Sequence, residues 1–338
     1  MGYRIGFDIG STTIKAVVLD ENNQICYKSY ERHKAQVRQK ALDKLVELKK
    51  YTKEPFKFAI SGSGALGLCE QGELPFVQEV FASATGVTKL YPETDCAIEL
   101  GGEDAKILFF QGSVEQRMNS TCAGGTGAFI DQMSTLLNMS LEEMNEASLN
   151  YHRLYPIASR CGVFAKTDIQ PLINQGVDKC DLCASIFQAV VDQTITSLAQ
   201  GRKIEGNILF LGGPLYFMSG LRKRFIETLK LSDAQVNCPE TAINFVALGT
   251  AICADQEYTY DELYKALEDL VHAPAKLTES KPLFESEEDY QKFIVRHKSH
   301  DAKYADLKNY DGKAYLGIDS GSTTTKLVLL DENDAILY

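Results

Sequence analysis

The sequence predicts an α/β protein with two lobes, and three observations support this prediction. The chain has 338 residues, which corresponds to roughly two domains at about 150 residues each. Two units of the same design, a strand, a polar turn with glycine and a second strand, occupy residues 3–19 and 95–110. Segments with the apolar spacing of helices lie between and after these units, as expected for a chain that packs helices on sheets.

The first unit opens the chain. Arg4–Ile9 is rich in β-forming residues, residues 10–13 form a polar turn, and residues 14–19 are again apolar. Two antiparallel strands exclude the strand–turn–helix opening of a Rossmann dinucleotide-binding domain. The spacing of apolar residues predicts a helix within residues 34–50, and residues 56–60 are predicted as a short strand that ends in a Ser-Gly-Ser-Gly loop.

The second unit follows a predicted helix at residues 76–85. Strands are predicted for Cys96–Leu100 and residues 106–110, on either side of a turn with two glycines and two acids. A glycine-rich loop at residues 121–127 leads to a predicted helix. The remaining predicted elements are helices at 128–137 and 185–198, the strand Ile208–Leu211, a helix through residue 225, and a helix at 246–253.

Residues 255–313 have a different character. Glycine almost disappears, charge density rises, and acidic helices are predicted at residues 260–271 and 285–297. This segment is interpreted either as a helical connector or as a solvated helical lid on the second domain, and the sequence favours neither interpretation.

The first unit is repeated near the end of the sequence. Residues 317–338 match residues 6–27 at 14 of 22 positions. We therefore expect residues 3–254 to form one module with lobes at about 3–95 and 96–254. Residues 255–313 would connect it to residues 314–338, the first hairpin of a second, truncated module of a longer protein. An isolated hairpin is only marginally stable.

The composition excludes several classes of protein. A formal net charge of −11 and a pI near 5.1 count against a nucleic-acid or anionic-membrane partner. No apolar run approaches the roughly 18 residues of a membrane span, and the N-terminus lacks the pattern of a signal peptide. The nine cysteines are therefore expected to be reduced thiols in the cytoplasm, with a few as metal ligands.

The two glycine turns suit the binding of nucleotide phosphates, because backbone N–H groups and hydroxyls can surround phosphate oxygens. One such turn alone is more often an ordinary β-turn, so the prediction depends on its double occurrence. Asp8 and Asp104, one in each unit, are the candidate catalytic residues and would hold Mg²⁺ through water. Lys15 is a candidate phosphate ligand, or else a surface lysine at a strand edge.

These turns resemble the nucleotide-binding motifs of the actin, sugar-kinase and heat-shock ATPase superfamily. Residues 8–13 are similar to its first phosphate loop, residues 99–104 to its second, and residues 211–213 to its adenosine motif. The resemblance implies two ribonuclease-H-like lobes, the actin-like ATPase fold, with a nucleotide cleft between them. Glu99 replaces the usual Asp of the second loop, and Pro214 lacks a backbone donor beside the adenosine motif.

Two segments with cysteine narrow the resemblance. Residues 119–129, with Cys122, and residues 159–168, with Cys161, are similar to the signatures of the 2-hydroxyacyl-CoA dehydratase activators, the BadF/BadG/BcrA/BcrD-type ATPases. The resemblance covers about residues 3–254, although Glu103 stands where Gln is usual. It implies that Cys122 and Cys161 hold one 4Fe–4S cluster together with the same pair of a homodimer mate, or of the second module in cis.

The resemblance also implies an ATP hydrolase coupled to electron transfer. A ferredoxin- or flavodoxin-type donor supplies the electron, and a dehydratase or reductase component with its own iron–sulfur centre receives it. The implied nucleotide-binding residues are glycines, hydroxyl residues and one lysine: Gly10, Ser11, Thr12, Thr13, Lys15, Gly101, Gly102, Gly124, Gly125, Gly212 and Gly213.

Other interpretations remain open. A small-molecule kinase for a sugar or carboxylate would use the same fold without needing Cys122 or Cys161, and a nucleotide-sensing scaffold would bind ATP without hydrolysing it. Cys180 and Cys183 form a CxxC pair, which is either functional or two residues on one helix face. The other cysteines are expected in the core: Cys26, Cys69, Cys96, Cys238 and Cys253.

Overall fold

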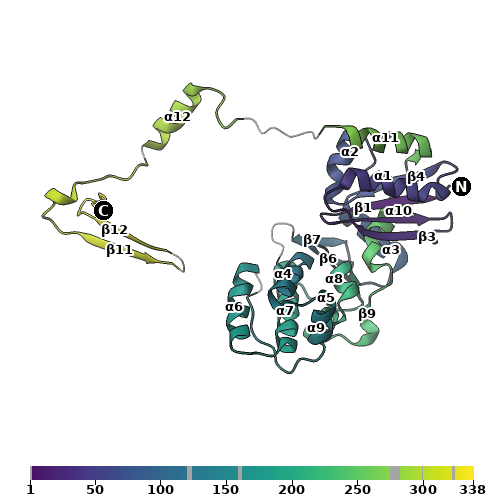
Figure 1. Cartoon of the computed structure of the whole chain (residues 1–338), viewed down its shortest axis with the longest axis horizontal. Coiled ribbons are helices and arrows are strands. Elements are labelled where there is room, and N and C mark those ends of the chain that lie inside the picture. The colour runs from purple at the N-terminus through teal and green to yellow at the C-terminus, as the bar shows by residue number, and fades with distance from the viewer. Residues whose placement is uncertain (1, 120–123, 159–161, 275–281, 299, 322–323) are drawn as a thin grey trace. The chain divides into compact units, whose positions relative to one another are not determined.

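The computed structural model of the chain describes all residues except 1, 120–123, 159–161, 275–281, 299 and 322–323. The chain divides into two compact units, Met1–Ala273 and Pro274–Tyr338 (Figure 1). Each unit is described by itself below.

The first unit contains two five-stranded sheets with the same central topology. In each sheet three antiparallel strands follow one another, and a later strand lies parallel to the first of the three. The order is β10-β4-β1-β2-β3 in one sheet and β7-β6-β5-β8-β9 in the other. The strands are β1 (Arg4–Ile9), β2 (Thr13–Leu19), β3 (Ile25–Arg32), β4 (Phe56–Ser61), β5 (Cys96–Leu100), β6 (Ala105–Phe109), β7 (Glu115–Asn119), β8 (Ile208–Leu211), β9 (Val236–Asn237) and β10 (Glu257–Tyr258).

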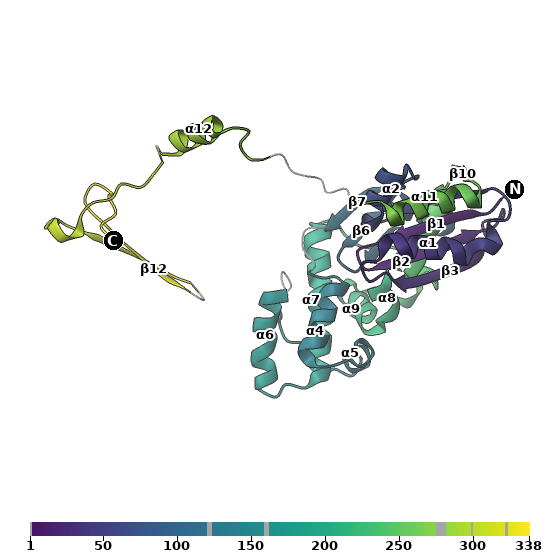
Figure 2. The same ribbon diagram turned by 45° about the horizontal axis from the view of Figure 1, so that its top comes forward.

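Helices cover both faces of both sheets (Figures 1 and 2). The outer face of the β1 sheet packs on α1 (Val37–Glu47), α2 (Leu66–Gly72) and α11 (Tyr260–His272). The outer face of the β5 sheet packs on α4 (Gly127–Leu137), α5 (Leu141–Ser148), α6 (Gly162–Asn174), α7 (Lys179–Thr194) and α9 (Ser219–Leu229). The short helix α8 (Gly213–Phe217) follows β8. The predicted α/β class and the repeated hairpin design are confirmed.

Two helices, α3 (Glu79–Leu90) and α10 (Phe245–Cys253), share one apolar core with the inner faces of both sheets. This core includes Val17 of the first sheet and Leu209 of the second. The two helices touch through their backbones, since a Cβ on Gly249 would lie 2.0 Å from the carbonyl oxygen of Ala82. Only glycine fits at this position.

The first unit extends beyond residue 254 and includes α11. This helix was expected either in the connector or as a lid on the second domain. Instead Leu263, Leu267 and Leu270 are buried in the core of the β1 sheet, beside α1. The apolar stripe of α11 covers the outer face of that sheet, which explains why the helix belongs to the unit that ends at Ala273.

One helix in the described part of the chain, Lys179–Ala199, is long and apolar enough to cross a membrane. Its apolar window is 72% buried inside the protein. The helix supplies Leu182, Phe187 and Val190 to the core of the second sheet, and this packing accounts for its apolar composition.

The second unit contains α12 (Glu287–Lys298) and an antiparallel hairpin of β11 (Tyr315–Ser320) and β12 (Thr325–Leu330). Register pairs in this hairpin correspond to those of β1 and β2: Asp319 faces Lys326 as Asp8 faces Lys15. The environments differ, because β1 is almost wholly buried whereas every residue of β11 is exposed.

Candidate nucleotide site

The turns of the β1–β2 and β5–β6 hairpins face each other. The Gly10 N–H donates to the Thr13 carbonyl over 2.9 Å, and the Gly101 N–H donates to the Asp104 carbonyl over 2.8 Å. A Cβ on Gly102 would lie 3.1 Å from Thr12 Oγ1 and 3.7 Å from Ser11 Oγ. The structure therefore brings together the residues predicted for the two phosphate loops, one loop from each sheet.

Asp8 and Lys15 form an ion pair beneath the first loop. The Lys15 Nζ lies 2.7 Å from Asp8 Oδ2, and the Asp8 side chain is only 2% exposed. Burial lowers the pKa of Lys15, but the carboxylates of Asp8, Glu99 and Glu79 outweigh it and raise the pKa above its usual value. Lys15 lies on β2, which is an interior strand between β1 and β3, and its side chain is 19% exposed, so the alternative of a surface lysine at a strand edge is wrong.

A second buried lysine, Lys106, pairs with Asp104 of the second loop. Its Nζ contacts Glu79, lies 2.7 Å from Asp104 Oδ2 and lies 3.6 Å from Glu99 Oε1. These three carboxylates raise the pKa of Lys106 well above its usual value despite burial. Ser83 Oγ donates to Glu99 over 3.1 Å. Neither Lys106 nor Glu79 was predicted from the sequence as a residue of this site.

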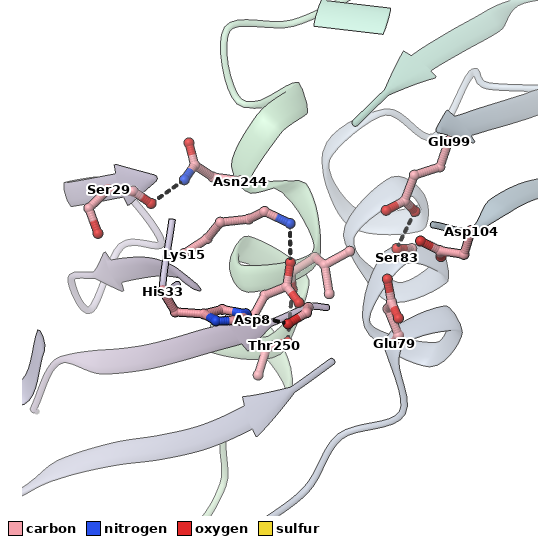
Figure 3. A network of polar contacts seen from close by, with 12 residues as sticks. Asp8, Lys15, Ser29, His33, Glu79, Ser83, Glu99, Asp104, Asn244 and Thr250 are labelled. Atoms are coloured by element: carbon pink, nitrogen blue, oxygen red, sulfur yellow. Dashed lines mark hydrogen bonds and ion pairs between the residues drawn. The ribbon is translucent and has the colours of Figure 1, made fainter. Parts of the chain in front are cut away.

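The site carries more carboxylates than lysines. The carboxylate of Asp8 pairs with Lys15, and those of Glu79, Glu99 and Asp104 pair with Lys106. Figure 3 shows the four carboxylates and Lys15. Burial, more than the neighbouring carboxylates, raises the pKa of Glu79 to about 7, although Lys106 lowers it. In the described part of the chain, no three His, Cys, Asp or Glu side chains gather closely enough to hold a metal ion directly. Carboxylate oxygens are the ligands that Mg²⁺ prefers, so the chemistry of this acidic cluster suits that ion.

The adenosine motif lies beside the second phosphate loop. Gly212 has a φ of +88°, and a Cβ there would lie 2.0 Å from the Leu100 carbonyl oxygen. A Cβ on Gly213 would lie 3.5 Å from the Tyr30 hydroxyl, and the Tyr30 ring meets Phe217 edge to face at 6.1 Å. Strand β3, which was not predicted, thus supplies an aromatic side chain beside this motif.

Helix α4 begins directly on the second phosphate loop. The N–H groups of Gly127 and Ala128 donate to the carbonyls of Gly101 and Gly102 over 3.0 and 2.7 Å. The first turn of a helix has free N–H groups, and here the phosphate loop accepts from two of them. Two backbone hydrogen bonds therefore join this loop to the start of α4.

Cys122 and Cys161 lie outside the described residues. Their described neighbours lie close to α4: Gly124 and Gly125 precede it, and a Cβ on Gly162 would lie 2.6 Å from Gln132 Oε1 on α4. Gly125 has a φ of +81°, and a Cβ there would lie 3.1 Å from Gln193 Cγ on α7. The two cysteine-containing segments therefore lead into helices that contact each other.

The CxxC pair lies at the start of α7. Cys183 is buried, and burial raises the pKa of its thiol to about 12. Burial also raises the pKa of Cys180. Such thiols are poor nucleophiles and poor metal ligands at neutral pH. Among the other cysteines, Cys69 and Cys96 are buried as expected, but Cys26 is exposed because β3 is an edge strand.

Several relatives of this chain are named as activators of dehydratases. It is 26% identical over 215 residues to the (R)-2-hydroxyglutaryl-CoA dehydratase activating ATPase of Acidaminococcus fermentans, covering 62% of this chain and 82% of the relative. It is 29% identical over 258 residues to the activator of lactoyl-CoA dehydratase of Anaerotignum propionicum, covering 75% and 97%.

Solved structures show the same fold. Component A of the (R)-2-hydroxyglutaryl-CoA dehydratase of Acidaminococcus fermentans matches with a TM-score of 0.66 and 24% identity, over 79% of this chain and all of the other. The activator of the 2-hydroxyisocaproyl-CoA dehydratase of Clostridium difficile, with bound ADPNP, matches with a TM-score of 0.66 and 25% identity, over 81% and 100%. The expected two-lobed ATPase fold is thereby confirmed.

A profile of the family described as BadF/BadG/BcrA/BcrD ATPases matches residues 5–254. This range contains both hairpins, the adenosine motif and both cysteine-containing segments. The chain belongs to the BadF/BadG/BcrA/BcrD ATPase family.

Proposed function

We propose that this protein is an ATP-dependent, electron-transferring activator of a 2-hydroxyacyl-CoA dehydratase or a related low-potential reductase. Its relatives are named as activators of such dehydratases. The observation that carries the proposal is the pair of hydrogen bonds that joins Gly101 and Gly102 of the second phosphate loop to the start of α4. They connect the nucleotide site to the cysteine-containing segments.

The nucleotide lies between the two hairpins. Phosphate oxygens accept hydrogen bonds from the first loop (Gly10, Ser11, Thr12 and Thr13), from Lys15, and from the second loop (Gly101 and Gly102). Asp8 and Asp104 orient the waters of a magnesium ion and the attacking water. Gly212 and Gly213 hold the adenosine, and Gly124 and Gly125 complete the site where α4 begins. The buried acid–lysine pairs support these roles, because they place charge where the two loops face each other.

ATP changes the relative position of the two lobes because it binds one conformer better than the other. A ligand shifts a conformational equilibrium only if it binds one conformer better than the other. Phosphates that contact both Ser11 and Gly102 favour the conformer in which these loops are correctly spaced. Because α4 is hydrogen-bonded to Gly101 and Gly102, it moves with the second loop.

Cys122 and Cys161 hold one 4Fe–4S cluster, together with the same pair from a second copy or from a second module in cis. When bound, the cluster supplies one-electron transfer at low potential. Four thiolates are needed, and the approach of both cysteine-containing segments to α4 supports the assignment. A ferredoxin- or flavodoxin-type donor in the cytoplasm and a dehydratase component complete the proposed pathway of the electron.

The repeated hairpin supports a second module. Residues 317–338 repeat residues 6–27 at 14 of 22 positions, and β11–β12 reproduces the register of β1–β2. We propose that this hairpin begins a second ATPase module, with residues 274–313 as the connection.

The proposal is tested with protein purified without oxygen and reconstituted with iron and sulfide. The wild type should show the visible absorbance of a cubane cluster and should hydrolyse ATP. Cys122→Ser and Cys161→Ser should each lose the cluster, whereas Cys26→Ser, at an exposed cysteine, should keep it. Retention of the cluster in both Cys122→Ser and Cys161→Ser would contradict the assignment. ATP turnover that requires a hydroxyl or carboxylate acceptor and ignores Cys122→Ala would indicate a kinase instead.

A further inference from the structure

His33 is buried beside the first phosphate loop, directly after β3. The residue is only 4% exposed. The His33 Nε2 is 3.0 Å from the Gly10 carbonyl oxygen. The His33 backbone N–H donates to the Thr12 carbonyl over 3.2 Å. His33 thus forms hydrogen bonds to two carbonyl groups of the loop at residues 10–13.

The contacts of the ring determine its tautomer. A carbonyl oxygen only accepts, so Nε2 carries the hydrogen that faces Gly10. The Ala35 N–H donates to Nδ1 over 3.2 Å, so Nδ1 carries a lone pair. His33 is therefore a neutral imidazole with both nitrogens satisfied, and its Nε2–H is directed at the loop.

The backbone that presents His33 is strained. Lys34 and Ala35 have φ values of 50° and 62°, so two consecutive residues other than glycine adopt the left-handed conformation. Side chains with a Cβ rarely adopt it, and such strain persists only where surrounding contacts impose it. Here the Ala35 N–H and the Gln36 N–H both bond back to His33, the latter to its carbonyl over 2.8 Å.

The bond to Gly10 sets the direction of the next peptide N–H. A peptide bond is planar and trans, so the Ser11 N–H points away from the Gly10 carbonyl. Holding that carbonyl on the side of His33 directs the Ser11 N–H to the opposite side. Ser11 Oγ and Thr12 Oγ1 face Gly102 of the second loop.

We propose that His33 is a positioning residue that presets the first phosphate loop for a nucleoside triphosphate. It acts through the Nε2–H bond to Gly10 and does not touch the ligand. The role rests on the proposed nucleotide binding at Gly10 to Thr13. Because the loop is ordered before the ligand arrives, loss of this bond weakens binding more than it slows the bound enzyme.

Two substitutions test the roles of the two ring nitrogens of His33 separately. In His33→Gln the longer side chain places its amide NH₂ where Nε2 was, so it can still donate to the Gly10 carbonyl. In His33→Asn the shorter side chain places its amide oxygen where Nδ1 was, so it can accept from the Ala35 N–H but does not reach Gly10. Thr52→Val is the matched control, because it removes another buried hydrogen bond to a backbone carbonyl, Thr52 Oγ1 to Lys49 over 3.1 Å, in the same lobe. The full chain is measured with MgATP by calorimetry and by steady-state hydrolysis.

We expect His33→Asn to raise the Kd and KM for ATP by about 2- to 10-fold, the equivalent of one hydrogen bond, with kcat changed less than about 2-fold. His33→Gln should restore the Kd to within about 2-fold of the wild type, and Thr52→Val should leave it unchanged. Equal effects of the Asn and Gln variants, or a fall in kcat alone, would overturn the proposal.

Two further readouts do not depend on ATP, and the first of them needs no variant. In the wild type, ¹⁵N NMR of the histidine rings should show His33 with hydrogen on Nε2, and an Nδ1–H tautomer would overturn the inference. In the absence of nucleotide, amide hydrogen exchange at residues 10–13 should be faster in His33→Asn than in His33→Gln. If this difference appears while the wild type binds no ATP, the proposed function fails and the positioning role of His33 survives.

Discussion

Lys15 Nζ lies 2.7 Å from Asp8 Oδ2, directly across the β1–β2 ladder. Glu99 and Lys106 occupy the same register in β5–β6, and Asp319 and Lys326 occupy it in β11–β12. In each hairpin the lysine follows the acid by seven residues. The unit that the chain repeats is therefore a hairpin with an acid–lysine pair behind its turn. In β1–β2 and β5–β6 the turn is the part that faces the candidate nucleotide site.

The first prediction concerns this pair. Lys15→Met would leave the Asp8 carboxylate buried without its partner and should lower the free energy of unfolding of the first unit by about 3 kcal/mol. Lys326→Met removes the equivalent lysine from the pair with Asp319, whose charged atoms lie 3.5 Å apart and whose side chains are about three-quarters exposed. This substitution should lower the free energy of unfolding by less than about 1 kcal/mol. Urea unfolding of both variants measures the difference, and equal losses would contradict the role of burial.

The second prediction concerns pH. Burial, above all, raises the pKa of Glu79 from 4.5 to about 7. A carboxyl with a raised pKa binds its proton more tightly in the folded protein, so its contribution to stability falls as pH rises through this window. The free energy of unfolding of the wild type minus that of Glu79→Gln should decrease between pH 4.5 and about 7, by at most about 3 kcal/mol.

Urea unfolding at several pH values checks this sign. The difference should be flat above pH 7, where Glu79 is ionised in both states. A difference that rises with pH would mean that Lys106 outweighs burial at this carboxyl.

The third prediction concerns the facing loops. Gly102→Ala would place a Cβ 3.1 Å from Thr12 Oγ1, which narrows the space that the phosphates need. We expect kcat/KM for ATP hydrolysis to fall roughly 10-fold, with little loss of stability. Gly67→Ala, on helix α2, adds a Cβ that meets nothing within 4 Å and should leave kcat/KM unchanged. Unaltered hydrolysis in Gly102→Ala would show that phosphates do not pass between the loops.

The fourth prediction concerns the extent of the first unit. Leu267 on α11 is 1% exposed, so Leu267→Ala should lower the free energy of unfolding by about 3 kcal/mol. Leu283 is 92% exposed, and the same substitution there should change it by less than about 0.5 kcal/mol. Urea unfolding measures both variants. If Leu267→Ala left the free energy of unfolding unchanged, α11 would not be part of the core.

Much of the fold was predictable because buried strands are strongly apolar. The strands of both hairpins and β8 were located within a residue or two of their observed bounds. The edge strands β3 and β7 were missed, because polar residues such as Lys28 of β3 and Arg117 of β7 interrupt the apolar pattern. The docking of α11 was also missed, since an amphipathic helix does not reveal which sheet its apolar stripe covers.

The site was only partly predictable. Glycine turns are visible in a sequence, whereas Glu79 and His33 come near the loops only through the packing of α3 and the end of β3. Lys106 was available from the sequence, because its spacing from Glu99 equals that of Lys15 from Asp8. That comparison between repeats is a stronger signal than the composition of either turn.

The hairpin of the second unit has a practical consequence. Leu316, Ile318 and Leu327 are each more than half exposed there, although their counterparts Ile5, Phe7 and Ala16 in the first unit are fully buried. A two-stranded ribbon with exposed apolar side chains is a template for self-association. Aggregation of the 338-residue chain should therefore begin at residues 315–330, and the chain that ends at Ala273 should remain the more soluble of the two.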